Sequence, residues 1–346
     1  MQEVLTVTGH AFVGEDLEMQ GVRIVVENGI IASIEEISRP EHYWILPSFF
    51  NAHTHIGDTI AMDIPAQGTL EELVAPPYGL KHRLLAATPP ELLVEGMRRS
   101  ARAIIRSGTA GFADFREGGG DGVRILQAAL AGLSCRAIIL GRDGGELNSH
   151  GIGIPQYTAG IEDAVGEMRK AGKFVAIHAG EKDPLDVDRA LDLAPDLLVH
   201  ATHATERQLR RCAEEEIPIA VCPRSNWALG VSRSPDHPPV RRMLDIGCTL
   251  CLGTDNVMFV QPDMFREIAF LSQVYRVEPL ECLKMAISAS SCFGPPFYLE
   301  RGNEANFMVL DPARGNLDFS RDPAATIVRR IDQDAIARNV LSSQSK

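Results

Sequence analysis

Short apolar runs alternate along the chain with segments of helical periodicity. In residues 91–107, for example, Leu93, Met97 and Ala101 fall on one stripe, as on a helix that covers a core. Strands that alternate with amphipathic helices predict a parallel sheet with crossover helices. The expected strands are 44–55, 109–116, 134–141, about 150–154, 174–180, 197–201, 217–222 and 248–254. Eight such strands are the count of a closed (β/α)8 barrel, so a TIM-like α/β barrel is expected.

Helices are expected after most of these strands, including 205–216, which Thr205 would cap, and 263–276. The connection between the third and fourth expected strands has no such helical pattern. Between Leu140 and Ile152 the chain is short and rich in glycine, so the barrel is expected to have an abbreviated third helix. An open α/β sheet is the alternative.

Both ends of the chain are rich in strand patterns. Residues 4–7, 21–26 and 30–34 read as strands, and the Asn28-Gly29 pair predicts a hairpin turn between the last two. Residues 306–310 and 326–329 read as strands again. We therefore expect a small β-sandwich domain built from residues 1–43 and 300–346, beside a barrel domain of residues 44–299.

Composition narrows the class of protein. A chain of 346 residues with 45% hydrophobic content can bury a large core. Its net charge of −12, without a Lys/Arg cluster, argues against a nucleic-acid partner. No apolar stretch approaches about 18 residues, which argues against a membrane span, and no secretion signal begins the chain. The seven cysteines are odd in number and lie mostly in apolar segments, so reduced thiols in a cytoplasmic setting are expected rather than a disulfide framework. The expected partner is a small molecule, and homo-oligomerisation is left open.

Five polar side chains suited to one divalent metal follow separate strand-like runs: His53, His55, His178, His200 and Asp255. His53 and His55 are two residues apart, so on an extended chain both imidazoles point to the same side. Strand ends at one face of a barrel can gather such ligands. Neutral imidazoles with one carboxylate suit Zn²⁺ or Fe²⁺, with Zn²⁺ favoured, and the absence of a bridging residue in the middle strands predicts a mononuclear site.

Glu181 lies just beyond His178, at the predicted mouth of the barrel. Desolvation there would raise the pKa of its carboxyl enough to shuttle protons near neutral pH. The alternative is a solvated loop carboxylate beside Lys182. His200 follows its apolar strand directly and is therefore expected inside the metal site, whereas His203 is expected in an outer shell or at the surface.

Substrate contacts are sought among polar residues near the same mouth. Residues 57–90 follow the first two histidines and are expected to fold over the site, and Asp58 and Tyr78 are their expected contributors. The arginines after three strands suggest a substrate with an anionic group; the alternative is pairing with the adjacent Glu117 and Asp143. The full candidate set is Asp58, Tyr78, Arg116, Glu117, Arg142, His150 and Arg224.

Several motifs carry a resemblance to a known family. They are NAHTH at 51–55, HAGE at 178–181, LLVHATH at 197–203, CPRSNWALG at 222–230 and LGTD at 252–255. In this order they resemble the amidohydrolase superfamily, and most of all its branch of nucleoside, nucleobase and S-adenosylhomocysteine deaminases with the related triazine chlorohydrolases. The match spans nearly the whole chain.

The resemblance implies a role for each residue. His53, His55, His178 and Asp255 would hold the metal, and His200 would position the bound water. Asp255 would also take a proton from that water, and Glu181 would deliver one to a ring nitrogen.

The expected function is hydrolytic deamination of an amino-substituted N-heterocycle, such as a purine, a pyrimidine or a pterin, by a metal-bound hydroxide. The nearest rival is hydrolysis of a cyclic amide or a halogenated ring at the same metal. A non-catalytic metal-binding scaffold is the remote alternative.

Overall fold

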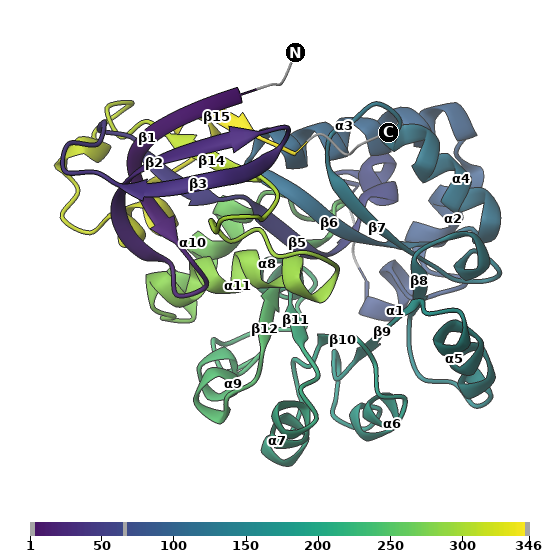
Figure 1. Cartoon of the computed structure of the whole chain (residues 1–346). Coiled ribbons are helices and arrows are strands. Elements are labelled where there is room, and N and C mark those ends of the chain that lie inside the picture. Colours follow the sequence, from purple (N-terminus) through teal and green to yellow (C-terminus); the bar gives the residue numbers. More distant parts are fainter. Residues whose placement is uncertain (1–3, 65–67, 343–346) are drawn as a thin grey trace.

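The computed structural model describes residues 4–64 and 68–342, which form a larger sheet with helices around it and a smaller sheet beside it (Figure 1). The larger sheet is parallel throughout, and its strands succeed one another in chain order. Its strands are β5 (Phe49–His55), β6 (Thr109–Arg116), β7 (Arg136–Gly141), β8 (Gly151–Ile154), β9 (Phe174–Ala179), β10 (Leu197–His200), β11 (Ile219–Val221), β12 (Leu250–Leu252) and β13 (Asp255–Asn256).

The barrel closes because β12 and β13 are two parts of its eighth strand. β12 pairs with β11, and β13 pairs with the first barrel strand, β5. Between them, a Cβ on Gly253 would lie only 2.8 Å from the Cβ of His53, so glycine is required for this close approach. Asn51 then ties the two strands together by donating to Thr254 Oγ1 at 2.7 Å. The expected TIM-like barrel is thereby confirmed.

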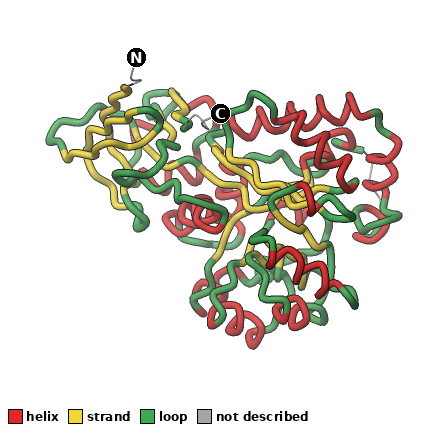
Figure 2. The backbone as a smooth tube through the Cα atoms, turned by 45° about the vertical axis from the view of Figure 1, so that its right-hand side comes forward, coloured by secondary structure: helices red, strands yellow, loops and turns green. Residues whose placement is uncertain are grey.

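Helices cover the outside of the barrel strands, as the tube in Figure 2 shows. The helices between and after the strands are α3 (Pro90–Arg106), α4 (Gly119–Leu130), α5 (Ile161–Lys170), α6 (Val187–Asp192), α7 (Glu206–Glu214), α8 (Pro223–Ala228), α9 (Val240–Ile246), α10 (Met264–Val274) and α11 (Pro279–Cys292). The expected cap is present, because Thr205 forms a capping box with Gln208 at the start of α7. The third crossover contains only the 3-10 turn η2 (Glu146–Asn148), as its glycines and short length predicted.

The second sheet combines strands from both ends of the chain. Its order is β15-β14-β4-β1-β2-β3, with β1 (Val4–Val13), β2 (Glu18–Glu27), β3 (Ile30–Glu36), β4 (Trp44–Pro47), β14 (Phe307–Leu310) and β15 (Ile336–Val340). The expected single strand over 44–55 is therefore divided. β4 pairs with β1 and β14, and β5 begins the barrel after Ser48.

The prediction of a strand at 326–329 is wrong, because these residues belong to the helix α12 (Pro323–Arg330). Asp322 caps the helix by accepting from Ala325 N at 3.0 Å, and Pro323 stands in its first turn. The short turns η3 (Leu317–Phe319) and η4 (Gln333–Ala335) flank it.

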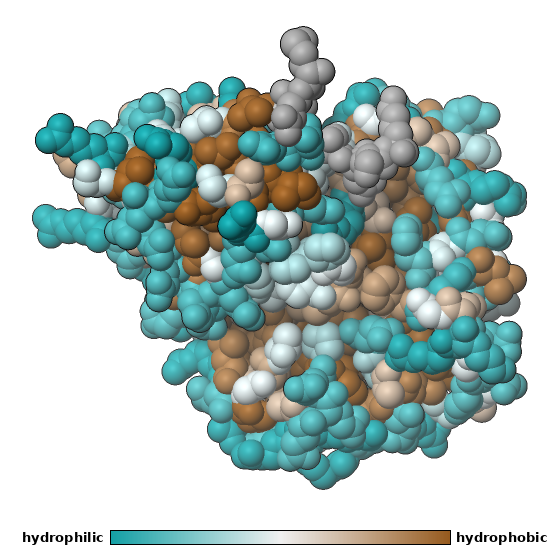
Figure 3. All heavy atoms as spheres, viewed as in Figure 1, coloured by the Kyte–Doolittle hydropathy of each residue, from teal (hydrophilic) through white to brown (hydrophobic). Residues whose placement is uncertain are grey.

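The segment between β5 and α3 contains η1 (Ile56–Ala61), α1 (Leu70–Leu73) and α2 (Leu80–Ala87). In the view of Figure 3, hydrophilic residues cover much of the outer helices, and hydrophobic residues are visible over the small sheet. Within the described residues, no helix combines the length and the apolar character that crossing a membrane requires.

Candidate active site

Four polar side chains converge where barrel strands end. His53 Nε2 lies 3.1 Å from Asp255 Oδ1 and 3.3 Å from His178 Nε2. His55 Nε2 lies 3.6 Å from the same Asp255 oxygen. As the two-residue spacing predicted, His53 and His55 project from β5 to the same side, and β9 and β13 bring His178 and Asp255 to meet them.

The ring orientations of these histidines fit a metal. His55 Nδ1 lies 3.0 Å from the carbonyl oxygen of Phe115, and His178 Nδ1 lies 2.8 Å from that of Ile154. A ring nitrogen that donates to a carbonyl carries the proton, so each Nε2 keeps its lone pair for the point where the four residues meet. Burial lowers the pKa of His53 and His178 and lowers that of His55 to about 3, which favours the neutral, metal-binding form.

Asp255 supplies the negative charge of this group. Burial alone would raise its pKa, but the hydrogen bond with His53 and the charges of the neighbouring histidines hold it well below its usual range. Ser225 of α8 donates to Asp255 Oδ2 at 2.8 Å, which leaves Oδ1 directed at the histidines. The donor set of three imidazoles and one carboxylate therefore fits one divalent cation of the Zn²⁺ or Fe²⁺ type.

His200 and Glu181 form the next part of the site. β10 ends at His200 with a φ of 77°, a left-handed conformation that is strained for a non-glycine residue and turns the ring toward His53 and Asp255. Gly180, with a φ of 66°, turns the chain after β9 and brings Glu181 Oε1 within 3.7 Å of His200 Nε2. Burial raises the pKa of the Glu181 carboxyl to about 8, with a further contribution from the charge of Asp255.

A cavity of about 390 Å³ opens over these groups. Its floor includes His55, His178, His200, Asp255 and Glu181. One wall comes from the segment after β5, with Leu70, Val74, Pro76 and Lys81. Residues 57–90 thus contribute to the cavity, as expected, and the volume suits a small-molecule ligand.

Comparisons with known proteins agree with this geometry. The family model for amidohydrolases matches residues 44–143, and the model for adenosine deaminase matches residues 141–291. A protein of Methanothermobacter thermautotrophicus described as a putative aminohydrolase is 34% identical over 97% of both chains. The chain belongs to the amidohydrolase superfamily. The matched amidohydrolase and deaminase models, together with the aminohydrolase relative, make it a hydrolase that acts on C–N bonds.

Solved structures share the fold of this amidohydrolase at low sequence identity. A guanine deaminase of C. acetobutylicum with bound guanine superposes with a TM-score of 0.77 at 17% identity, covering 99% of both chains. An atrazine chlorohydrolase of Arthrobacter aurescens in complex with zinc has a TM-score of 0.81 at 16% identity, covering 98% of this chain and 94% of the other.

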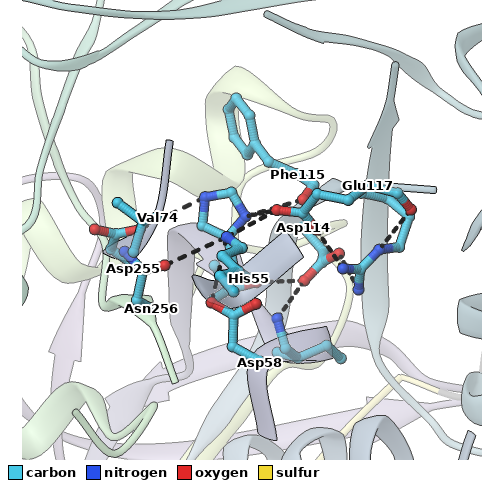
Figure 4. A network of polar contacts seen from close by, with 12 residues as sticks. His55, Asp58, Val74, Asp114, Phe115, Glu117, Asp255 and Asn256 are labelled. Atoms are coloured by element: carbon cyan, nitrogen blue, oxygen red, sulfur yellow. Dashed lines mark hydrogen bonds and ion pairs between the residues drawn. The ribbon is translucent and has the colours of Figure 1, made fainter. Parts of the chain in front are cut away.

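Arg142 is the arginine of the candidate set that the amidohydrolase fold brings to the cavity. Its side chain is 9% exposed, and its contacts are Glu117 Oε1 at 3.3 Å and Asp143 at 4.0 Å. Glu117 and Asp58 lie behind the cavity wall in a buried polar network. Figure 4 shows His55 between Asp255 on one side and Phe115 with Glu117 on the other.

The remaining candidates lie away from the cavity, so the structure corrects the expectation that they reach it. Arg116 is 1% exposed and pairs with Asp114 at 3.3 Å and with Glu117. Arg224 points to Glu267 Oε2 at 2.5 Å. Both guanidinium groups are thus held by carboxylates within the fold. The partners of Arg116 include the adjacent Glu117, as the alternative allowed, whereas the partner of Arg224 is distant in the sequence.

Tyr78 and His150 are also displaced from the cavity. Tyr78 is 84% exposed and lies on the outer side of residues 57–90. His150 precedes β8, and its Nδ1 accepts from the backbone N–H of Ile139 at 3.0 Å, which makes it part of the strand edge.

Sequence reasoning missed Lys81, Ser225 and Asn226. The latter two lie in the motif at 222–230, whose Pro223 starts α8, so that motif could have indicated them. Asn226 donates to Thr202 Oγ1 at 2.8 Å. Lys81 has no local signal, because tertiary contacts alone bring its ammonium to the site.

Lys81 lies 2.8 Å from Glu117 and 3.3 Å from Asp58. Burial would lower the pKa of Lys81, but the charges of Asp58 and Glu117 raise it. Burial would likewise raise the pKa of Glu117, but Lys81, His55 and Arg116 hold it well below its usual range. Asp58 differs, because burial raises its pKa to about 7 against the opposing charge of Lys81. The network therefore keeps Glu117 ionised.

Proposed function

We propose that this amidohydrolase is a metal-dependent hydrolytic deaminase of an amino-substituted N-heterocycle. The observation that carries the proposal is the position of Glu181. Its carboxyl, with a pKa raised by burial, lies beside His200 and above a group of metal-type ligands in one cavity. A protonatable acid beside a site for an activated water is what displacement of an amine from a ring requires.

His53, His55, His178 and Asp255 would hold one divalent ion, with Zn²⁺ favoured over Fe²⁺. When bound, such an ion lowers the pKa of water to about 7 and so supplies a nucleophile at neutral pH. The carboxylate of Asp255 accepts a proton from the attacking water, while Ser225 holds its other oxygen. His200 orients that water through Nε2, which faces the cavity beside Glu181.

Glu181 then performs the proton transfers on the substrate. Its carboxyl donates a proton to the ring nitrogen next to the amine-bearing carbon, which makes that carbon electrophilic. The water oxygen bonds to this carbon while the proton of the water passes to Asp255. That proton then moves to the exocyclic amine, the C–N bond breaks and ammonia leaves, and the hydroxyl on the carbon returns a proton to Glu181 as the C=O bond forms. Water and the amino heterocycle thus give the oxo heterocycle and ammonia, so the atoms balance.

Two further observations support this proposal. The adenosine deaminase model spans the part of the chain that holds His178, Glu181, His200 and Asp255. The cavity volume of about 390 Å³ is at the small end of ligand sites, which suits a heterocycle with modest substituents.

The test is a screen for ammonia release. Purines, pyrimidines, pterins and their nucleosides or phosphates are incubated with the purified protein and with its Glu181→Gln variant, and metal content is measured in parallel. We expect ammonia from one class of heterocycle, with a much lower rate in the variant. Ring opening of a cyclic amide or chloride release, without ammonia from any amino heterocycle, would establish the rival reaction instead.

A further inference from the structure

Glu117 lies directly behind His55, on the side of the ring that faces away from Asp255. Glu117 Oε1 is 2.9 Å from His55 Nδ1, and the carbonyl oxygen of Phe115 is 3.0 Å from the same atom. His178 has only the backbone carbonyl of Ile154 at the equivalent nitrogen. Within the described site, His55 is thus the one proposed ligand among the three histidines that has a carboxylate behind it.

The carboxylate of Glu117 is fixed by cations from three separate parts of the chain. Lys81 Nζ lies 2.8 Å away and Arg142 Nη2 lies 3.3 Å away, and Arg116 contacts its second oxygen. Glu117 is only 6% exposed, so these cations are what keep it ionised inside the protein. An ionised carboxylate behind an imidazole selects the tautomer with the lone pair on Nε2 and raises the basicity of that atom.

Lys81 contributes to this arrangement from residues 57–90, the segment that forms one wall of the cavity. It is the only buried residue among the eight of α2, and none of the apolar side chains of that helix is fully buried. Its ammonium also lies 3.3 Å from Asn256 Oδ1, next to the proposed ligand Asp255. Because a buried ammonium must be paired to be tolerated, docking of α2 depends on these contacts.

We propose that Glu117 is a positioning residue for His55, and that Lys81 makes this positioning depend on the docking of α2. The inference rests on the proposed metal-dependent function. Docking of α2 brings Lys81 Nζ to Glu117, Glu117 is held against His55 Nδ1, and His55 Nε2 is held toward Asp255. The segment that forms a cavity wall is thereby linked to the affinity and geometry of the metal site.

The experiment measures metal affinity rather than turnover. Metal-free wild type, Glu117→Gln, Lys81→Met and the double variant are titrated with Zn²⁺ against a chelating indicator, and visible spectra are recorded with Co²⁺. Arg83→Met is the matched control, because it removes a cation from the exposed side of the same helix. Circular dichroism of the metal-free proteins checks that each variant folds.

We expect about a 10- to 100-fold loss of Zn²⁺ affinity in Glu117→Gln, a loss of about 10-fold or more in Lys81→Met, and altered Co²⁺ bands in both. The double variant should lose less than the product of the single losses, because both changes act on one contact. Arg83→Met should bind like the wild type. If Glu117→Gln does not fold, the Zn²⁺ affinity of Lys81→Met alone tests the inference. Lys81→Met is expected to fold, because Arg116 and Arg142 still pair with Glu117 in that variant.

Normal Zn²⁺ affinity and unchanged Co²⁺ bands in Glu117→Gln would overturn the inference and leave the proposed function standing. A normal Lys81→Met variant would overturn the link to α2. Equal losses of Zn²⁺ affinity in Lys81→Met and Arg83→Met would also overturn this link, because they would reflect only the total charge of the helix. A wild-type protein that binds no divalent ion would refute the proposed function, and the inference with it.

Discussion

The Nε2 atoms of His53 and His178 lie 3.3 Å apart, although 125 positions separate the two residues along the chain. The Nδ1 atom of His178 faces a carbonyl, so its Nε2 carries a lone pair toward His53. Burial lowers the pKa of both rings, which disfavours a shared proton between them. A divalent cation would satisfy this pair of nitrogens together with Asp255.

We therefore predict about one divalent ion per chain in active protein, measured by elemental analysis. Stripping it with a chelator should lower thermal stability, because an ion present at about 1,000 times its Kd stabilises the fold by about 4 kcal/mol. His178→Ala should lose the ion and this stabilisation, whereas His203→Ala, which changes a histidine outside the cluster, should keep both. Two ions per chain would contradict the mononuclear site.

Glu181→Gln is predicted to retain the fold and the metal and to lose at least about 10²-fold in kcat, as expected when a general acid is removed. Asp183→Asn is the matched control, since it neutralises a carboxylate of the same loop that also lines the cavity. Near-normal turnover of Glu181→Gln with metal retained would remove Glu181 from the mechanism.

The pH profile offers an independent check on the same residue. Burial raises the pKa of the Glu181 carboxyl to about 8, so it holds its proton below that pH and loses it above. Since the proposed step needs the protonated form, kcat/KM should fall by about tenfold per pH unit above about pH 8. The residual activity of Glu181→Gln should lack this alkaline limb. An identical limb in the variant would assign it to another group.

Arg142 and Arg116 should respond differently to the same substitution. Arg142→Met, at the cavity, should raise KM for a substrate with an anionic substituent more than for its neutral counterpart, with the fold retained. Arg116→Met should instead destabilise the protein by roughly 3–5 kcal/mol, because it leaves Asp114 with its buried charge unpaired. Steady-state kinetics and denaturant unfolding distinguish the two. Equal effects on KM from both variants would contradict the placement of Arg142.

The barrel and the convergence of its histidines could be predicted because both rest on local signals. The two-residue spacing of His53 and His55 determines their common side on any strand, whatever surrounds it. Arg116 and Arg142 show where prediction from local sequence signals ends. Each stands at the end of a strand and has an acidic neighbour. Only the fold decides that Asp114 holds Arg116 inside while Arg142 reaches the cavity.

Two other errors had different causes, one in tertiary contacts and one in a local signal that was not weighed. Lys81 lies in a helix without a clear apolar stripe, and its role follows from Glu117, Asp58 and Asn256, which are distant in sequence. The β-branched residues Thr326, Ile327 and Val328 suggested a strand. The Asp322 cap and the proline after it were the stronger signal, and they start a helix.

The central claim is that ammonia release depends on the metal held by these residues. The direct measurement is ammonia produced per oxo heterocycle formed, on the best substrate of the screen, by protein as purified, after metal removal and after Zn²⁺ is restored. The account predicts one ammonia per product, loss of the reaction when the ion is removed and its recovery when about one equivalent of Zn²⁺ returns. Undiminished ammonia release by verified metal-free protein would contradict it.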